Sequence, residues 1–352
     1  MEPKFNRPRI DLYSDTQSKP SPAMRKAIAS ADVGDEQRNE DPTVCRLQDM
    51  VSEFLNKEAA LFLPSGTMGN AIAYRVWTEP GQEVILDKTS HVLHSEAGGA
   101  AALSGVMMRP LEGVRGVFTE DQVLAAVRPV DRYNIPQSAM VSIEQTVNAG
   151  GGCVWPLSMV ETMGKTTKDN NLALHMDGAR LINAVVAKNV PASAYAAPCN
   201  SLWIDLSKGL GCPIGAVIAG NTDFISQARR FKHQFGGAMR QAGIVAAAGV
   251  YALENNIERI VTDHENAHKL AEGIANIKGL TLEFGLPETN MVYFTVDAHR
   301  TSAMGLSDRL WGEFGIRIGV SGSQRLRAVT HIDISDNDID ETLSGLNTIL
   351  KD

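Results

Sequence analysis

The sequence predicts an α/β fold, with a large domain built on a mostly parallel sheet and a smaller C-terminal α/β domain. Short apolar runs of strand length alternate with longer helical patterns through the first two-thirds of the chain, which is typical of a parallel sheet with crossover helices. From about Gly249 a long amphipathic segment is followed by alternating strands. We therefore expect an N-terminal arm over 1–22, a large domain over 23–248 and a small domain over 249–352.

Each predicted strand of the large domain ends in a turn rich in Gly, Pro, Ser, Asp or Asn. These strands are expected at 59–63, 84–86, 140–143, 172–176 and 202–204. In the small domain we expect a helix over 256–277, strands at 280–284, 291–296 and 326–334, a helix near 306–314 and a closing helix. Open α/β sheets bind ligands at the C-terminal ends of their strands, so polar side chains at those ends are candidate site residues.

Composition narrows the class of protein. Of 352 residues, 43% are apolar and 21% charged, as in ordinary folded, water-soluble chains. A formal net charge of -8 argues against a nucleic-acid partner and favours a small-molecule substrate. Cys45, Cys153, Cys199 and Cys212 form no CxxC pair, so neither a metal site nor a disulfide framework is expected. Residues 1–8 lack a signal-peptide core and no apolar run could span a bilayer, so we expect a cytoplasmic protein without membrane contact.

A lysine in a glycine-rich turn is the first candidate for chemistry. The segment 202–215, Leu-Trp-Ile-Asp-Leu-Ser-Lys-Gly-Leu-Gly-Cys-Pro-Ile-Gly, places Lys208 just past a buried strand. Partial removal from water favours the neutral amine that condenses with a carbonyl to form an imine. Taken alone, Lys208 could equally be a surface residue of a flexible turn.

An aspartate follows the predicted strand at 172–176. Asp177 could pair with the ring nitrogen of pyridoxal 5′-phosphate (PLP), because a protonated ring draws electrons from a carbanion at the substrate Cα. The alternative for Asp177 is an N-cap of the next helix.

Two further segments complete a possible PLP site. Between a strand and an apolar helix, the backbone NH groups and hydroxyls around Ser65, Gly66 and Thr67 could hold a phosphate, although a plain turn is the alternative. His91, with Glu96 close behind, could stack on a cofactor ring, or could be an ordinary hydrogen-bonded histidine. All four signals fall at predicted strand ends, and this agreement predicts a PLP enzyme without a metal.

On these and further residues, the sequence resembles the low-specificity L-threonine aldolases, in the beta-eliminating lyase group of fold-type-I (aspartate aminotransferase-like) PLP enzymes. The stretches that carry the resemblance cover nearly the whole chain. They are Asp-Leu-Tyr-Ser-Asp-Thr at 11–16, Val-Gly-Asp at 33–35, Glu-Asp-Pro-Thr at 40–43, Phe-Leu-Pro-Ser-Gly-Thr at 62–67, Glu-Ala-Gly-Gly at 96–99, Asp-Gly-Ala-Arg at 177–180, Leu-Ser-Lys-Gly-Leu-Gly at 206–211, Gly-Gly-Ala-Met-Arg-Gln-Ala-Gly at 236–243 and Arg-Ala-Val-Thr-His at 327–331.

The resemblance implies a role for each candidate residue. Lys208 would be the Schiff-base lysine, and His91 would stack on the ring and serve as the candidate base. The other cofactor-binding residues would be Ser65, Gly66, Thr67, Asp177, Arg180 and, from a neighbouring subunit, Arg240. The residues that hold the substrate carboxylate would be Ser14, Arg180 and Arg327, a task that suits bidentate guanidinium groups. The family usually forms homotetramers, as dimers of dimers, with active sites at the dimer interface.

The chain departs from the family pattern at several positions. It has Tyr13 in place of Arg, Arg38-Asn39 in place of Tyr-Gly, His233 in place of Lys, and Glu-Gln-Thr-Val in place of Glu-Asn-Thr-His, ending at Val147. The added cation at Arg38 suggests a substrate with a second acidic group, of the 3-hydroxyaspartate type. Alternatively, Arg38 and Tyr13 have exchanged positions and preserve a structural contact.

The activity that the resemblance implies is cleavage of a β-hydroxy-α-amino acid to glycine and an aldehyde. His91, or a water near it, is the candidate base, since the family's second histidine is replaced by Val147. One alternative is PLP-dependent β-elimination, in which Lys208 would remove the Cα proton. Another is a catalytically silent binding protein that has kept the fold.

Overall fold

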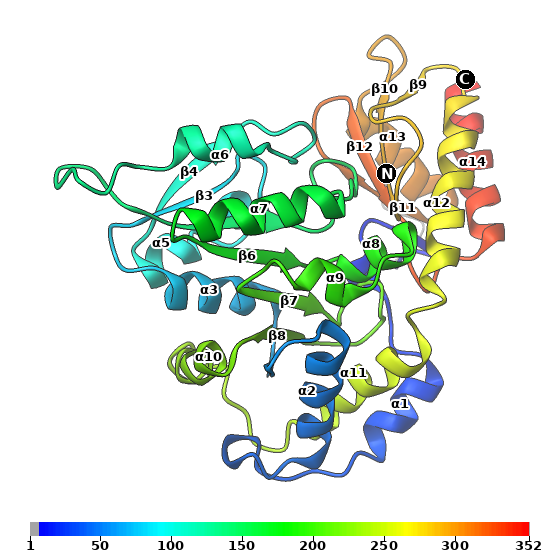
Figure 1. Cartoon of the computed structure of the whole chain (residues 1–352). Helices are drawn as coiled ribbons and strands as arrows, with labels where there is room; N and C mark the ends of the chain where they lie inside the picture. The colour runs from blue at the N-terminus through cyan, green and yellow to red at the C-terminus, as the bar shows by residue number, and fades with distance from the viewer. Residues whose placement is uncertain (1–6, 352) are drawn as a thin grey trace.

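The computed structural model describes residues 7–351 and contains two sheets, each covered by helices (Figure 1). The first six residues of the predicted arm lie outside the described range. The larger sheet has seven strands in the order β2-β8-β7-β6-β5-β3-β4. Their bounds are β2 (Ala59–Leu63), β3 (Glu83–Asp87), β4 (Met107–Leu111), β5 (Ser138–Glu144), β6 (Ala173–Gly178), β7 (Ser201–Asp205) and β8 (Ala216–Gly220).

Only β8 runs antiparallel to its neighbours in this sheet, so the predicted mostly parallel sheet is confirmed. All five predicted strands are present, and β4 and β8 are two that the sequence analysis missed. The helices of this part are α1 (Pro22–Ala29), α2 (Pro42–Leu55), α3 (Gly66–Trp77), α4 (His91–His94), α5 (Gly99–Ser104), α6 (Glu120–Ala126), α7 (Leu157–Asp169), α8 (Leu181–Lys188), α9 (Ala192–Ala196), α10 (Thr222–Gln234) and α11 (Gly243–Asn255), with 3-10 turns η1 (Asp15–Gln17) and η2 (Glu36–Arg38).

Alternating side chains of the central strands enter two separate cores. In β7, Leu202 and Ile204 join the core beneath α2, α7 and α9, whereas Trp203 joins the core beneath α3 and α10 on the other face. Both faces of the sheet are therefore covered, as expected for parallel strands with near-continuous apolar sequence. Their C-terminal ends remain available for polar residues.

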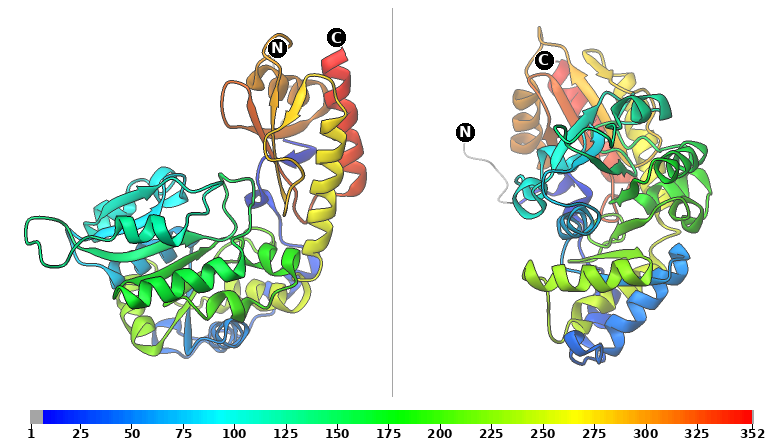
Figure 2. Two further views of the ribbon diagram at one scale, coloured as in Figure 1. Left: turned by 45° about the horizontal axis from the view of Figure 1, so that its top comes forward. Right: turned by 60° about the vertical axis from the view of Figure 1, so that its left-hand side comes forward.

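The smaller sheet has five strands in the order β1-β11-β12-β10-β9. Its elements are β1 (Ile10–Leu12), β9 (Leu280–Leu282), β10 (Met291–Val296), β11 (Ile316–Val320), β12 (Arg325–Val329), α12 (Ile260–Ala275), α13 (Ala303–Arg309), a π-helical turn η3 (Leu310–Phe314) and α14 (Asp336–Lys351). Figure 2 shows α12 and α14 side by side along this sheet. The expected strand at 326–334 ends at Val329, where the chain leaves the ladder, and β11 was not predicted.

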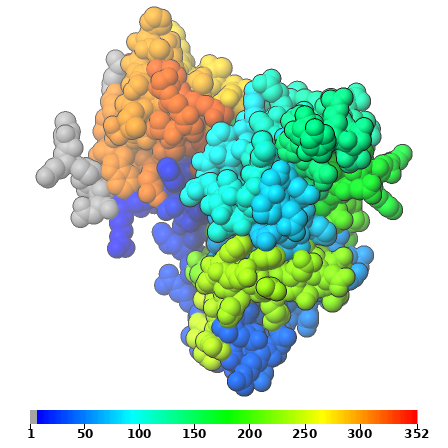
Figure 3. Space-filling view, turned by 90° about the vertical axis from the view of Figure 1, so that its left-hand side faces the viewer, coloured from blue at the N-terminus to red at the C-terminus, as the bar shows by residue number. Residues whose placement is uncertain are grey.

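The N-terminal segment belongs to this smaller sheet, because β1 pairs in parallel with β11 more than 300 residues later. In Figure 3 the C-terminal region (orange) lies against the cyan part of the molecule, with blue N-terminal residues below it. The domain boundaries at 1–22, 23–248 and 249–352 stay a prediction, and α11 spans the second of them. Across residues 7–351, no helix combines the length and apolar character needed to cross a bilayer.

A buried ion pair ties helix α10 to the short turn η2 in the large part of the molecule. Lys232 of α10 and Glu36 of η2 are 2% and 4% exposed, and their ammonium and carboxylate groups are in direct contact. The second oxygen of Glu36 accepts a hydrogen bond from the Met239 amide, at 3.1 Å. This arrangement fixes the loops that carry Arg38 and Arg240.

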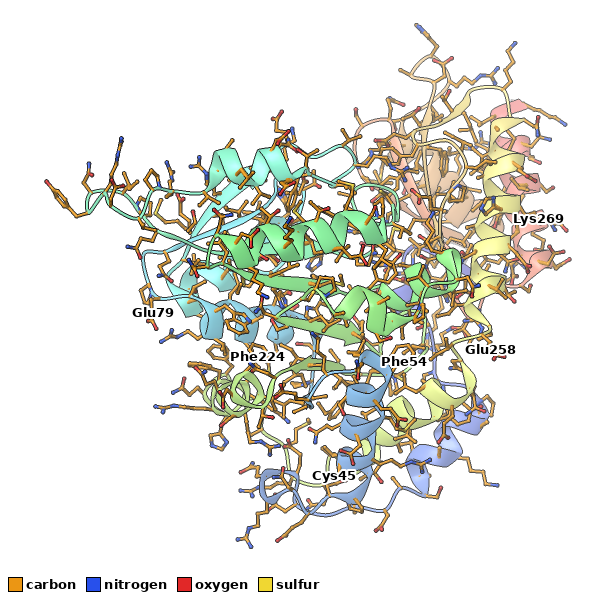
Figure 4. All side chains as sticks on the ribbon, viewed as in Figure 1. Cys45, Phe54, Glu79, Phe224, Glu258 and Lys269 are labelled. Atoms are coloured by element: carbon orange, nitrogen blue, oxygen red, sulfur yellow. The ribbon has the colours of Figure 1, made fainter. Side chains whose placement is uncertain are left out.

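We expect Lys232→Met to lower the free energy of unfolding by about 3 kcal/mol, because it leaves the buried carboxylate of Glu36 without its counter-charge. Urea denaturation would measure this loss. Lys269→Met is the matched control, since Lys269 of α12 (labelled in Figure 4) pairs with the exposed acids Asp336 and Asp340 of α14 and its removal should change stability little. Equal effects of the two substitutions would contradict the buried-pair argument.

Candidate active site

Three carboxylates meet at the C-terminal edge of the large sheet. Glu144 is the last residue of β5, Asp177 is the penultimate residue of β6, and Asp205 ends β7. Glu144 and Asp177 are register partners on adjacent parallel strands, so their side chains leave the sheet next to each other. This edge is where a parallel sheet presents its ligand-binding side chains.

A cavity of about 510 Å³ opens above these strand ends. Small-molecule sites fall in this size range. Most residues predicted for the site line this one cavity. They are Ser14, Ser65, Gly66, Thr67, His91, Glu96, Asp177, Arg180, Lys208 and Arg327. The structure therefore brings together parts of the chain that are more than 300 residues apart.

Asp177 is a buried acid with an unusual charge environment. Burial, followed by the charges of Glu144 and Glu96, raises the pKa of Asp177 to about 7. Its Oδ1 accepts a hydrogen bond from the Ala179 amide at 3.0 Å, and its Oδ2 accepts one from Asn70 Nδ2 at 2.8 Å. A cation placed against Asp177 would stabilise its ionised form.

His91 and Glu96 form a pair across the short helix α4. Nδ1 of His91 lies 2.8 Å from Oε1 of Glu96, and this hydrogen bond raises the pKa of His91 despite the opposing effect of burial. The His91 amide donates to Oε2 of Glu144 at 2.9 Å. When neutral, His91 would donate from Nδ1 to Glu96 and leave Nε2 as its basic nitrogen.

Lys208 has an acidic partner that the sequence analysis did not identify. Its Nζ lies 2.7 Å from Oδ2 of Asp205, the residue that ends β7. The same nitrogen lies 5.7 Å from the centre of the Trp203 ring. The ammonium group is thus held inside the cavity, between the strand end and the indole.

The start of α3 offers a cradle for an anion. Ser65 caps the helix by accepting the Met68 amide at 3.3 Å, while the amides of Gly66 and Thr67 belong to the first turn and have no partner within the helix. Gly66 is required by packing, since a Cβ there would lie 2.3 Å from the Trp203 ring.

Two arginines connect the cavity to the N-terminal segment and the small sheet. Arg180 forms a two-point ion pair with Asp15, at 2.7 Å for both contacts, and both residues are buried. Burial alone would raise the pKa of Asp15, but the Arg180 guanidinium holds it well below its usual range. Arg327 donates to Oδ1 of Asn148 at 2.9 Å and to the Tyr13 carbonyl at 3.1 Å.

Arg38 and Arg240 do not line the cavity of their own chain. Both lie near Asp35, with Arg240 Nη1 at 2.9 Å from its Oδ2 and Arg38 Nε at 3.9 Å. Tyr13 instead places its ring 5.2 Å from the Arg317 guanidinium. Arg38 and Tyr13, two of the departures from the family pattern, therefore have different neighbours: Arg38 lies near Asp35, and Tyr13 lies against Arg317.

The other two departures also lie outside the cavity. Val147 is buried in the core and forms an isolated antiparallel β-bridge with Cys153, while His233 is exposed near the end of α10. Asn148, the residue after Val147, does line the cavity, and its backbone N–H donates to Oε1 of Glu144 at 2.7 Å.

Sequence reasoning missed residues whose role depends on distant partners. They are Asp15, Asn70, Glu144, Asn148, Trp203 and Asp205. Asn70 could have been noticed, because it is an asparagine among the apolar residues of the segment that forms α3 and is buried there. Among the described residues, no group of three His, Cys, Asp or Glu side chains could hold a metal ion.

Comparison with known proteins identifies the family. Residues 11–299 match the Beta-eliminating lyase family. The low specificity L-threonine aldolase of Escherichia coli K12 is 38% identical over 97% of this chain and 99% of its own. The probable low-specificity L-threonine aldolase 2 of Arabidopsis thaliana is 39% identical over 97% of each chain. The chain belongs to the low-specificity L-threonine aldolase family.

Solved structures agree with this family on the fold. The threonine aldolase of Leishmania major superimposes with a TM-score of 0.83 at 17% identity, covering 97% of this chain and 99% of that one. Serine palmitoyltransferase of Sphingomonas wittichii gives 0.73 at 16% identity, covering 97% and 86%. This threonine aldolase family member is thus a fold-type-I, PLP-dependent carbon–carbon lyase, which confirms the predicted fold, cofactor and enzyme class.

The residues present fit PLP. The free amides at Gly66 and Thr67 suit its phosphate, and Lys208 supplies an amine for its aldehyde. Asp177, with a pKa raised to about 7 by burial and neighbouring acids, would be stabilised by a protonated ring nitrogen. The site therefore offers one complementary group to each polar part of the cofactor.

We expect Gly66→Ala to weaken PLP binding roughly tenfold, or about 1.4 kcal/mol, because the new methyl group would displace the Trp203 indole or the phosphate cradle. Fluorescence titration of the apoenzyme with PLP measures the change. Gly99→Ala is the control, since Gly99 also begins a helix and a Cβ there meets nothing within 4 Å. Equal affinities in both variants would contradict the proposed cradle.

Proposed function

We propose that this protein cleaves a threonine-like β-hydroxy-α-amino acid to glycine and an aldehyde. The observation that carries the proposal is one cavity lined by an amine at Lys208, a buried acid at Asp177 and a guanidinium at Arg327. The family relationship supports the same reaction, since the Escherichia coli and Arabidopsis thaliana relatives, at 38% and 39% identity, are named low-specificity L-threonine aldolases.

Each of these residues would have a defined role. Lys208 would hold PLP covalently through its Nζ. When bound, PLP accepts the electron pair that is released at the substrate Cα. Asp177 would keep the ring nitrogen protonated, and His91 would stack on the ring. Ser65 and the amides of Gly66 and Thr67 would bind the phosphate.

The substrate carboxylate would bind at the side of the cavity that faces the small sheet. Arg327 is oriented there by Asn148 and the Tyr13 carbonyl, and Ser14 lies nearby in the same lining. Arg180 would support this pocket while its guanidinium stays paired with Asp15. A carboxylate held in this way orients the bonds at Cα relative to the ring.

His91, acting directly or through a water, would take the proton of the β-hydroxyl. Its neutral form keeps Nε2 as an acceptor, since Nδ1 donates to Glu96. Loss of that proton drives cleavage of the Cα–Cβ bond and releases the aldehyde. This role does not need a histidine at the position of Val147.

The proposal also includes the oligomeric state and the cellular location of the protein. We infer a cytoplasmic homotetramer, a dimer of dimers, in which Arg240 and Arg38 reach the active site of a neighbouring subunit. Both side chains are largely exposed, on loops that the Glu36–Lys232 pair holds in place. If Arg38 does reach that site, substrates with a second carboxylate, of the 3-hydroxyaspartate type, would gain a counter-charge.

The reaction is tested by incubating the PLP-loaded protein with a set of β-hydroxy amino acids and measuring glycine, aldehyde, 2-oxo acid and ammonia. We expect glycine and aldehyde in equal amounts, and Lys208→Ala should lower turnover by a factor of roughly 100 or more. A 2-oxo acid with ammonia as the main products would instead support β-elimination. No turnover with PLP bound would support a silent binding protein.

The pH dependence tests the role of the His91–Glu96 pair. Because Glu96 raises the pKa of His91, the neutral base appears only as the pH rises through that raised value, so activity should fall on the acid side. Glu96→Gln removes the raising charge, and the acid limb of the kcat/KM profile should move to lower pH. Glu112→Gln, which breaks only the exposed contact with Lys88, should leave the limb in place. An unmoved limb in Glu96→Gln would exclude His91 as the titrating base.

A further inference from the structure

A single buried amide lies behind the cavity wall, and no step of the proposed reaction uses it. Asn70 is one turn into α3, is 1% exposed and does not line the cavity. Its side chain nevertheless makes four hydrogen bonds, to side chains from three other parts of the chain. Such a fully connected buried amide has a fixed orientation.

The polarity of the amide follows from its neighbours. The indole Nε1 of Trp203 lies 2.7 Å from Oδ1 of Asn70, and an indole nitrogen can only donate. The atom that it contacts must therefore be the amide oxygen. The amide nitrogen must then face the opposite way, toward the two carboxylates.

A second chain of hydrogen bonds reaches the same oxygen and is compatible with this orientation. His175 Nε2 lies 3.3 Å from Oδ1 of Asn70, and burial lowers the pKa of His175 to about 3, so its ring is neutral. Because the Trp203 contact makes Oδ1 of Asn70 an acceptor, the neutral ring would donate to it from Nε2 and leave Nδ1 to accept from Ser201 Oγ, which lies 2.9 Å away. Ser201 Oγ accepts in turn from the Trp77 indole at 2.8 Å. Both chains begin at an indole N–H and end at the oxygen of Asn70.

Both hydrogens of the amide nitrogen are then committed to acids. Nδ2 of Asn70 donates to Oε1 of Glu96 and to Oδ2 of Asp177, at 2.8 Å in each case. Oε1 of Glu96 is also the oxygen that contacts His91 Nδ1. One amide thus connects the acid expected to face the cofactor ring with the acid that orients the candidate base.

We propose that Asn70 is a positioning residue that holds the carboxyl groups of Asp177 and Glu96 side by side, so that one amide supports both the ring-nitrogen end and the His91 end of the site. The inference rests on the proposed function, in which Asp177 pairs with the PLP ring nitrogen. It adds a residue outside the cavity to the machinery that binds the cofactor.

The charge environment shows why this amide matters. The charged groups that face Asp177 are Glu144 from β5, Glu96 from the α4–α5 turn and Lys208 from the turn after β7, with His91 also close by. Two of the three groups beside Asp177 are acids, and the hydrogen bond from Asn70 opposes their effect on its pKa. Without that donor, Asp177 would be neutral over a wider pH range and would attract a pyridinium less strongly.

Asn70→Asp tests the inference, because it keeps an oxygen for Trp203 and His175 but replaces the NH2 donor with an acceptor between two acids. We expect the Kd of the apoenzyme for PLP, relative to wild type at the same pH, to rise at least about tenfold at pH 6.5. This ratio should fall toward about threefold or less at pH 9, where Asp177 ionises again. A purely structural role would give a ratio that does not change with pH.

Trp203→Phe is the second variant, for the case that Asn70→Asp does not fold. It keeps an aromatic ring against Gly69 but removes the indole N–H that orients the amide, so a smaller ratio with the same pH trend is expected. Asn266→Asp is the control, since this buried asparagine donates only to the Ile334 carbonyl in the small domain and its ratio should stay near one.

The outcomes separate this inference from the proposed function. Wild-type protein that fails to bind PLP would remove both. Wild-type protein that binds PLP, together with Asn70→Asp and Trp203→Phe ratios that are near one or constant with pH, would overturn the role of Asn70 alone.

Discussion

The proposed site depends on keeping one carboxylate, Asp177, charged at the end of a buried strand. An isolated buried charge is expensive, and two neighbouring acids, Glu96 and Glu144, make ionisation harder still. Hydrogen bonds from Asn70 and the Ala179 amide recover part of this free energy. A protonated pyridine nitrogen would offset the remaining cost, which supports the proposed pairing of Asp177 with the PLP ring.

The small sheet completes this site from the opposite side. Its first strand, β1, leads directly into Ser14 and Asp15, and the Asp15–Arg180 pair joins that segment to the end of β6. The third strand in the order of this sheet, β12, supplies Arg327. Closing the cavity therefore requires pairing between β1 and β11, which are separated by about 300 residues, and this explains why the N-terminal segment is ordered against the C-terminal part.

The sequence predicted the elements that are specified by residues adjacent in the chain. Apolar strands followed by glycine-rich or acidic turns placed Lys208, Asp177 and the turn at Ser65–Thr67 at strand ends, and the structure brings all of them into one cavity. The edge strand β4 was missed because it is half exposed and contains Pro110, and β8 because its Ala-Val-Ile-Ala-Gly sequence carries little strand signal. Partners such as Asn70 for Asp177, 107 residues apart, could not be predicted, because hydrogen bonds between distant segments leave no periodic pattern.

The most direct test of this account is the ¹⁵N chemical shift of the pyridine nitrogen in labelled PLP bound to the protein. With wild-type protein at pH 8, the account predicts the shift of a protonated ring nitrogen, and with Asp177→Asn the shift of an unprotonated one. An unprotonated nitrogen in the wild type, or the same shift in both proteins, would contradict the claim that Asp177 binds the ring as a carboxylate.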